Sequence, residues 1–262
     1  MARRLELNLF QITSPRMKNI CIMGLGNMGQ AIFDTLKDDY EIVTCLRDDD
    51  VNEKVKSCDV LLIAVKPQDF YDLAGDFTVD LDGKLIISIM AGVSTEKISL
   101  LLGAQKVVRV MPNLPLKVGA GISGWYANKN VSDDEKSFIK DIFGRMGTEI
   151  SVDEEDKINK ITALSGGGPA YYYYLNRALR MKAEELGFNE EDARKIVGGT
   201  LQGAAKLLKE TGECSGKIIS RIACKGGTTE AALMRLDSEG VEQTIMDAVE
   251  AAYKRAQELN ED

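Results

Sequence analysis

Short apolar runs alternate with amphipathic stretches through the first 150 residues, and this alternation limits what the chain can fold into. The runs expected to form strands are residues 20–23, 41–46, 60–65, 85–89 and 107–111. Helical periodicity fills the gaps between them, for example at residues 28–37 and 95–102. Because helices cover both faces of a parallel sheet, its strands are continuous apolar runs of this kind. The sequence therefore predicts an α/β domain, and residues 119–126 and 148–152 are candidates for further edge strands.

The strand pattern ends near residue 151, and only helical patterns follow it. We expect helices at residues 153–164, 170–186, 190–210, 215–223, 228–236 and 241–259. Pro169 suits the first turn of a helix, Gly187 suits its end, and Asn189 suits the N-cap of the next helix. The change of period predicts two domains, at residues 17–151 and 152–262. Residues 1–16 are expected to form an extension outside the fold.

The chain contains no histidine, which removes whole classes of mechanism. Nucleophiles activated by histidine are excluded, as are metal sites ligated by histidine, and we expect no metal. Proton transfer must therefore use carboxylates, Lys, Tyr, Cys, hydroxyl groups or water. The formal net charge of −8 also argues against nucleic acid or an anionic membrane as a partner held by bulk charge.

Five cysteines, at positions 21, 45, 58, 214 and 224, are scattered and form no Cys-x-x-Cys pair. Such an odd set is typical of reduced thiols, so we expect a cytoplasmic location. The chain has no apolar run approaching the roughly 18 residues of a transmembrane helix. Its first residues are also a poor signal peptide, because Glu6 and Asn8 interrupt their apolar part.

A glycine-rich turn links the first expected strand to the first expected helix. It consists of Gly24, Leu25, Gly26, Asn27, Met28 and Gly29, in the pattern Gly-x-Gly-x-x-Gly. In this context Gly24 permits the tight turn, Gly26 lets a pyrophosphate approach the backbone, and Gly29 lets helix and strand pack closely. The first N–H groups of the helix would then face the phosphates. The pattern predicts a Rossmann-type dinucleotide site, and a turn without a ligand is the alternative.

Further candidate cofactor contacts follow the ends of the expected strands, where ligands bind in open α/β sheets. They are Arg47, Ala64, Val65, Lys66, Pro67, Ala91, Gly92 and Asn113. Arg47 stands where an acidic residue would favour NADH, so it favours the 2′-phosphate of NADPH, although three aspartates follow it. Two prolines close to Asn113 would hold its amide rigidly. The alternatives are that Arg47 and Lys66 only face solvent and that the Asn113 loop is a stiff connection.

Two glycine-rich loops precede helices in the second half of the chain, at residues 165–171 and 225–229. The second combines bare backbone, a helix N-terminus and the hydroxyls of Thr228 and Thr229, which together suit a carboxylate. Lys225 would add charge. The alternative is close helix packing at glycine with an ordinary threonine cap. Four consecutive tyrosines at residues 171–174 face all directions of a helix, so we expect them to be buried, as in a subunit interface.

Taken together and in order, these motifs resemble those of the pyrroline-5-carboxylate reductases. They are GLGNMG at 24–29, AVKP at 64–67, AG at 91–92, RVMPNLP at 109–115, SGGGPAY at 165–171 and KGGTTEA at 225–231. The resemblance covers residues 17–253 and implies a Rossmann domain followed by an all-helical dimerisation domain. It also implies reduction of 1-pyrroline-5-carboxylate, a cyclic imine, to L-proline with NADPH or NADH, in a homodimer or larger homo-oligomer.

The resemblance assigns the substrate to the second half of the chain. By it, Gly226, Gly227, Thr228 and Thr229 would hold the substrate carboxylate, with Thr229 also near the ring nitrogen. Lys225 lies beside them, and Glu155 matches an acidic position near the substrate in some members. The chain departs from the family at Cys224-Lys225, Leu114 and Gly167, where Ser-Pro, Thr and Ser are usual. These departures beside the expected pocket permit a related substrate.

Two other functions stay open at this point. One is a reductase for another imine or keto acid, including the β-hydroxyacid dehydrogenase type, which shares the glycine turn. That type places a lysine beside the reacting carbon, for which Lys160 is the candidate. A regulatory homologue would bind NADP without catalysis. The absence of histidine favours an imine, because a protonated cyclic imine takes up hydride to give a neutral amine directly. A ketone would instead leave an alkoxide that needs a strong acid nearby.

Overall fold

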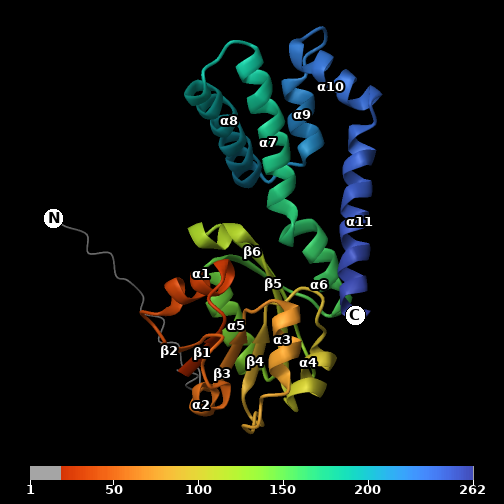
Figure 1. Ribbon diagram of the computed structural model, residues 1–262. Helices are drawn as coiled ribbons and strands as arrows, with labels where there is room; N and C mark the ends of the chain where they lie inside the picture. The colour runs from red at the N-terminus through yellow and green to blue at the C-terminus, as the bar shows by residue number, and fades with distance from the viewer. Residues whose placement is uncertain (1–18, 262) are drawn as a thin grey trace, which may run out of the picture. The chain divides into compact units, whose positions relative to one another are not determined.

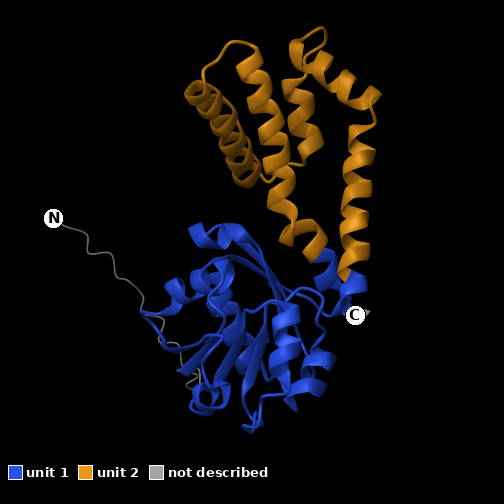
Figure 2. Ribbon diagram, viewed as in Figure 1, with its two compact units in different colours: residues 1–161, 257–262 blue, residues 162–256 orange. Residues whose placement is uncertain are grey.

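Strands and helices alternate through the first part of the chain, as the sequence predicts (Figure 1). The structure is a computed structural model that describes residues 19–261, so the expected extension at residues 1–16 lies outside the described residues. The chain divides into two compact units (Figure 2). Unit 1 contains residues 1–161 and 257–262, and unit 2 contains residues 162–256.

A seven-stranded sheet forms the centre of unit 1, with the strand order β2-β1-β3-β4-β5-β6-β7. Its strands are β1 (Asn19–Met23), β2 (Glu41–Cys45), β3 (Val60–Ile63), β4 (Leu85–Ser88), β5 (Lys106–Pro112), β6 (Gly121–Ala127) and β7 (Gly147–Ser151). The first five strands are parallel to one another, β6 runs antiparallel to β5, and β7 runs parallel to β6. The two further strands expected at an edge are therefore present, with β7 outermost.

Helices cover both faces of this sheet (Figure 1). Those of unit 1 are α1 (Asn27–Leu36), α2 (Val51–Lys56), α3 (Pro67–Ala74), α4 (Thr95–Leu102), α5 (Asp133–Gly144) and α6 (Asp156–Ile161). Successive residues of β1 point to opposite faces, so Ile20 and Ile22 pack with α1 and α5, whereas Cys21 and Met23 pack with α2, α3 and α4. Burial on both faces explains why the strands are continuously apolar.

The parallel register aligns the carboxyl ends of the strands. Met23 at the end of β1 is paired with Cys45 on one side and with Ile63 on the other. Ile63 is paired in turn with Ser88, and Ser88 with Arg109. The residues that follow these strands therefore meet at one rim of the sheet, where open α/β sheets bind their ligands.

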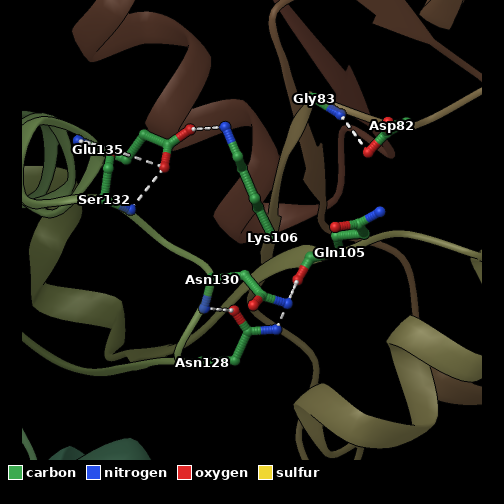
Figure 3. A network of polar contacts seen from close by, with 8 residues as sticks. All are labelled: Asp82, Gly83, Gln105, Lys106, Asn128, Asn130, Ser132 and Glu135. Atoms are coloured by element: carbon green, nitrogen blue, oxygen red, sulfur yellow. Dashed lines mark hydrogen bonds and ion pairs between the residues drawn. The ribbon is translucent and has the colours of Figure 1, made fainter.

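A polar network stabilises the opposite rim, where β5 begins (Figure 3). The carboxylate of Glu135 accepts hydrogen bonds from Lys106 Nζ at 2.9 Å and from the backbone N–H of Ser132 at 2.8 Å. Ser132 in turn caps α5 by accepting a hydrogen bond from the Glu135 N–H. Asn128 and Asn130 both donate to the carbonyl oxygen of Gln105. These bonds fix the loop between β6 and α5 and lie away from the ligand-binding rim.

Unit 2 is built from helices. A π-helical turn (Thr162–Gly166) leads into α7 (Gly168–Glu185), α8 (Glu190–Thr211), α9 (Ser215–Ile222), α10 (Thr228–Ser238) and α11 (Val241–Glu261), whose last residues belong to unit 1. Pro169 lies in the first turn of α7, and the Asn189 side chain caps α8 by accepting from the Asp192 N–H, both as predicted. Gly187 follows α7 with a positive φ of 97°, a conformation that ends helices.

The tyrosine run of α7 does not pack inside unit 2. Tyr172, Tyr173 and Tyr174 are 59–68% exposed, so the expectation that they are buried is wrong for the single chain. Leu175 and Leu179 on the same helix are likewise half exposed. Unit 2 therefore presents large apolar side chains that its own helices do not cover.

No helix within residues 19–261 has both the length and the apolar character needed to cross a bilayer.

Candidate active site

The turn between β1 and α1 contains three glycines. Two stand where only glycine fits, and the third leaves the space beside the turn open. Gly24 has a positive φ of 91°, and a Cβ added there would lie 2.8 Å from Val65 Cγ1. A Cβ on Gly29 would lie 2.0 Å from the carbonyl oxygen of Gly24, so the helix and the turn touch directly. A Cβ on Gly26 would meet no protein atom within 4 Å. The side of the turn at Gly26 is thus open to a ligand.

The start of α1 is suited to a phosphate. Gly26 is the N-cap and offers no side chain to the first N–H groups of the helix, those of Asn27, Met28 and Gly29. Free N–H groups and the positive end of the helix dipole bind anions. A cavity of about 380 Å³ lies next to the turn, within unit 1. Its lining includes four residues that were predicted as cofactor contacts, namely Gly24, Leu25, Arg47 and Val65.

Four aspartates that were not predicted as site residues also line this cavity. They are Asp49, Asp69, Asp72 and Asp76. Asp49 accepts a hydrogen bond from the Leu46 N–H at 2.8 Å and pairs with Lys54 at 3.6 Å. The spacing of Asp69, Asp72 and Asp76 along and just beyond α3 places them on one helix face, a signal that could have found them. Arg47 is exposed among these acids, and within the described residues it has no ion-pair partner.

The segment after β3 packs against the glycine turn. The Ala64 N–H donates to the carbonyl of Met23 at 2.8 Å, and Ala64 Cβ lies close to Gly29. Lys66 is the N-cap of α3 and Pro67 its first residue, so the proline fixes the exit of the strand. The Lys66 side chain makes no capping hydrogen bond and is exposed. The structure therefore brings two of the predicted cofactor motifs together at one rim.

The loop after β4 contacts the end of the chain. Gly92 has a positive φ of 71°, and a Cβ there would lie 2.3 Å from Leu259 Cβ. Both residues belong to unit 1. Asn260, next to Leu259, donates to Asn159 Oδ1 at 3.1 Å. Glycine is required at this position because the last turn of α11 lies against its backbone.

Asn113 is held rigidly, as the sequence predicts, and its side-chain oxygen accepts a hydrogen bond from the protein's own backbone. It is 6% exposed, and its Oδ1 accepts from the Ile122 N–H at 2.8 Å. Its own N–H donates to the Ile122 carbonyl at 3.1 Å. Asn113 therefore ties the end of β5 to β6 and fixes the turn that follows, and its predicted contact with the cofactor stays a prediction.

Glu155 lies in a network inside unit 1. Its two carboxylate oxygens accept from the N–H and the hydroxyl of Thr95, each at 2.7 Å, and it pairs with Arg109 at 3.5 Å. Arg109 is 1% exposed and also donates to Asn159 Oδ1 at 2.8 Å. Burial lowers the pKa of Arg109, and the charge of Glu155 opposes that shift. Arg109 was not predicted as a site residue. The signal that could have indicated it is an arginine inside an otherwise apolar strand.

The loop predicted to hold the substrate carboxylate lies in unit 2. Gly227 is the N-cap of α10 without a side-chain cap, so the first N–H groups of the helix, including those of Thr228 and Thr229, are open. Gly226 has a positive φ of 74°, and its N–H donates to Glu230 Oε2 at 2.6 Å. A carboxylate of the protein therefore already occupies one of the predicted donors. Within the described chain, the Thr228 and Thr229 hydroxyls and the Lys225 ammonium have no partner.

The three positions that depart from the resembled family are all exposed within their units. Leu114 is 45% exposed, and both Gly167 and Cys224 lie at the surface. A Cβ on Gly167 would lie 3.7 Å from the Tyr171 hydroxyl, which is ordinary contact, so this glycine is not required by space. Lys160, the candidate of the hydroxyacid alternative, pairs with Asp156 at 3.0 Å.

Comparisons with known proteins agree with these features. Residues 155–259 match the family model described as pyrroline-5-carboxylate reductase dimerisation, and residues 48–92 match the model described as NADP oxidoreductase, coenzyme F420-dependent. Pyrroline-5-carboxylate reductase of Haemophilus influenzae is 34% identical over 92% of this chain and 97% of its own length. The chain belongs to the pyrroline-5-carboxylate reductase family. This confirms the family that the motifs indicated.

Solved structures of reductases in this family have the same fold. A pyrroline carboxylate reductase of Plasmodium falciparum with NADP bound has a TM-score of 0.85 at 28% identity, covering 93% of this chain and 98% of that one. A pyrroline-5-carboxylate reductase of Coxiella burnetii has a TM-score of 0.79 at 32% identity, covering 93% and 99%. The predicted fold class is confirmed, with a Rossmann-type sheet followed by a helical region that matches the dimerisation model.

Proposed function

We propose that this member of the reductase family transfers a hydride from NADPH, or from NADH, to the carbon–nitrogen double bond of 1-pyrroline-5-carboxylate and so makes L-proline. The observation that carries the proposal is the match to named reductases over 92% of the chain, which includes both the glycine turn at α1 and the loop at 225–229. Bound NADPH supplies the hydride. The protein contributes the binding and orientation of the two reactants.

The two reactants are proposed to bind to different motifs of the chain. In the proposal, the α1 turn, Arg47, the segment 64–67 and the pair Ala91-Gly92 hold the cofactor. The open N-terminus of α10 and the hydroxyls of Thr228 and Thr229 hold the substrate carboxylate, with Lys225 adding charge. A substrate carboxylate at Gly226 would exchange with that of Glu230, so binding there replaces one anion by another.

Thr229 is the residue proposed to act at the ring nitrogen. A protonated cyclic imine becomes a neutral amine when hydride adds to its carbon, so no separate acid is required in that step. Hydroxyls and backbone amides are sufficient for such a site, which agrees with a chain that lacks histidine. For Glu155 the contacts with Thr95 and Arg109 favour a positioning role, and its contact with substrate stays a prediction.

We also propose a cytoplasmic homodimer or larger homo-oligomer assembled through unit 2. All five cysteines are free, which suits a reducing compartment. Burial raises the pKa of the Cys21, Cys45 and Cys58 thiols, so they stay protonated and unreactive. The exposed apolar side chains of α7 and the match of residues 155–259 to a dimerisation model support the assembly. Nothing in the charge or motifs favours nucleic acid or a membrane as a further partner.

The test is oxidation of NADPH by the purified protein with 1-pyrroline-5-carboxylate, alongside a panel of hydroxy acids and other imines. Thr229→Val should lower kcat/KM by about 10- to 1,000-fold, the range for losing a polar contact made in the transition state. Thr244→Val is the matched control, because within the described residues this α11 hydroxyl donates only to the carbonyl of Gly240, just before the helix. NADPH binding without turnover of any imine would favour the regulatory alternative, and hydroxy-acid turnover would favour the dehydrogenase.

A further inference from the structure

A lysine that follows β5 reaches the start of α1. Lys117 lies in a short 3-10 turn (Leu114–Val118) that follows β5. Its Nζ donates to Asn27 Oδ1 at 3.1 Å, across 90 residues of sequence. Asn27 is the first residue of α1 and belongs to the glycine turn. The fold therefore places an ammonium group beside the helix terminus that is proposed to bind the cofactor phosphates.

The turn that carries Lys117 is fixed at several points, so this placement does not depend on a loose loop. Asn113, just before the turn, is bound to Ile122 through both its backbone N–H and its side chain. Leu116 inside the turn is 2% exposed, and a Cβ on Gly121 would lie 2.7 Å from Leu116 Cβ. The Gly119 N–H closes the turn by donating to the Leu116 carbonyl at 3.1 Å.

The charge of Lys117 is not balanced by the protein. Within the described residues its only polar partner is the neutral amide of Asn27. Six other lysines of unit 1 form ion pairs with carboxylates, whereas Lys66 and Lys129 form none within the described residues; the paired lysines are Lys37, Lys54, Lys106, Lys136, Lys157 and Lys160. A cation beside a helix N-terminus is unfavourable, because the end of the helix dipole is also positive. An anion between the two would be attracted by both.

We propose that Lys117 is a cofactor-binding residue that contacts the pyrophosphate of the nicotinamide dinucleotide at the start of α1. The inference rests on the proposed placement of the cofactor at the glycine turn. Pyrophosphate is common to NADPH and NADH, so Lys117 contributes to the binding of both. Arg47, in contrast, is proposed to act on the 2′-phosphate that only NADPH carries. Substitution of Lys117 is therefore expected to affect the binding of both cofactors, and substitution of Arg47 the binding of NADPH alone.

The experiment measures dissociation constants of NADPH and NADH by titration calorimetry on the full chain. Lys117→Met removes the charge and keeps most of the side-chain length, and it should weaken the binding of both cofactors by about tenfold or more. Lys117→Arg should retain binding within about threefold, because the charge is kept. The difference in cofactor affinity between Lys117→Met and the wild type should shrink at high salt, because salt screens the charge interaction in the wild type.

Three control variants separate the explanations. Lys129→Met removes an exposed, unpaired lysine elsewhere in unit 1 and reports the effect of net charge alone. Asn27→Ala removes the amide that Lys117 contacts and keeps the lysine, so it tests whether Lys117 acts only by positioning Asn27. Arg47→Ala should weaken NADPH and leave NADH unchanged. Thermal unfolding of each variant shows that it is folded.

The outcomes are distinct. The proposal is overturned if Lys117→Met binds both cofactors as the wild type does, if its loss equals that of Lys129→Met, or if Asn27→Ala reproduces it in full. Gly26→Val tests the cofactor site itself, since a side chain there would fill the open face of the turn. If Gly26→Val keeps NADPH affinity, the site and the Lys117 inference both fail. If only Gly26→Val loses affinity, the Lys117 inference alone fails.

Discussion

The two units differ in how much apolar surface they bury by themselves. In unit 1 the sheet packs against helices on both faces, and strands such as β3 (Val60–Ile63) are fully buried. In unit 2 the buried cluster consists of Ala183, Ala193 and Val197, which are all small. Unit 2 instead exposes tyrosines and leucines of α7. The difference teaches that the sheet unit buries its large apolar side chains within itself, whereas the helical unit leaves many of its own for another surface to cover.

A second copy of the chain is the natural source of that surface, because residues 155–259 match a dimerisation model. Obligate dimers bury interfaces that resemble a domain core cut in half, and their stability depends on protomer concentration. The loop at 225–229, which is proposed to bind the substrate carboxylate, lies in this same unit. In the proposal, substrate binding and assembly both depend on one helical region, whereas the glycine turn proposed to bind the cofactor belongs to unit 1.

The strongest test of the comparison places the same charge on an exposed leucine in each unit. Leu179→Asp on α7 should weaken assembly by at least about 2 kcal/mol, or roughly 30-fold in the dissociation constant, as for an interface hot spot. Leu100→Asp is the control on α4, where the leucine is 82% exposed. Analytical ultracentrifugation measures the assembly. Equal behaviour of the two variants would mean that α7 is not an interface.

A second prediction concerns the polar network that holds unit 1 together. Glu155→Gln removes the charge paired with the buried Arg109 and should lower the free energy of unfolding by roughly 3 kcal/mol, the lower end for a broken buried pair. Urea unfolding measures the change. Glu154→Gln, at the exposed neighbouring residue, should have almost no effect. An unchanged unfolding midpoint with a raised KM for the imine would show that Glu155 serves the substrate instead.

The smallest effect is expected at the opposite rim and depends on pH. Burial raises the pKa of Glu135, but the bonds from Lys106 and Ser132 lower it further, so the net shift is downward. A carboxyl group whose pKa is lower in the folded state stabilises the fold at pH values above its unfolded-state pKa of about 4.3. That stability is lost as the pH falls through the folded-state pKa.

Glu135→Gln should therefore cost about 1–2 kcal/mol near neutral pH and almost nothing in acid, where the wild-type carboxyl is protonated. Thermal unfolding across pH measures the difference. Asp134→Asn removes a neighbouring, exposed charge from the same first helical turn and controls for the helix dipole. A difference between Glu135→Gln and wild type that persists at low pH would contradict the assignment.

Local patterns in the sequence predicted local structure well. The glycine turn at 24–29, the proline in the first turn of α7 and the Asn189 cap each depend on a few neighbouring residues, and each is present. The period of apolar residues also distinguished the buried strands from the helices. Such features need no knowledge of distant contacts, because backbone geometry determines them.

Contacts across long stretches of sequence were not predictable in the same way. Glu155 meets Thr95 across 60 residues, and Lys117 meets Asn27 across 90. The exposed tyrosines of α7 show the same limit, because their amino-acid type indicates burial and gives no information on which chain supplies it. The spacing of Asp69, Asp72 and Asp76 indicates that they share a helix face, but not that this face borders the cavity.

The contact between Gly92 and Leu259 has a consequence for how the chain is connected. Because the last turn of α11 returns to unit 1, the helical unit is an insertion within the sheet unit, and the backbone passes between the two units twice. A segment tethered at both ends has fewer conformations when unfolded than one tethered at a single end. The helical unit therefore loses less conformational entropy when it folds than it would as a segment attached at one end.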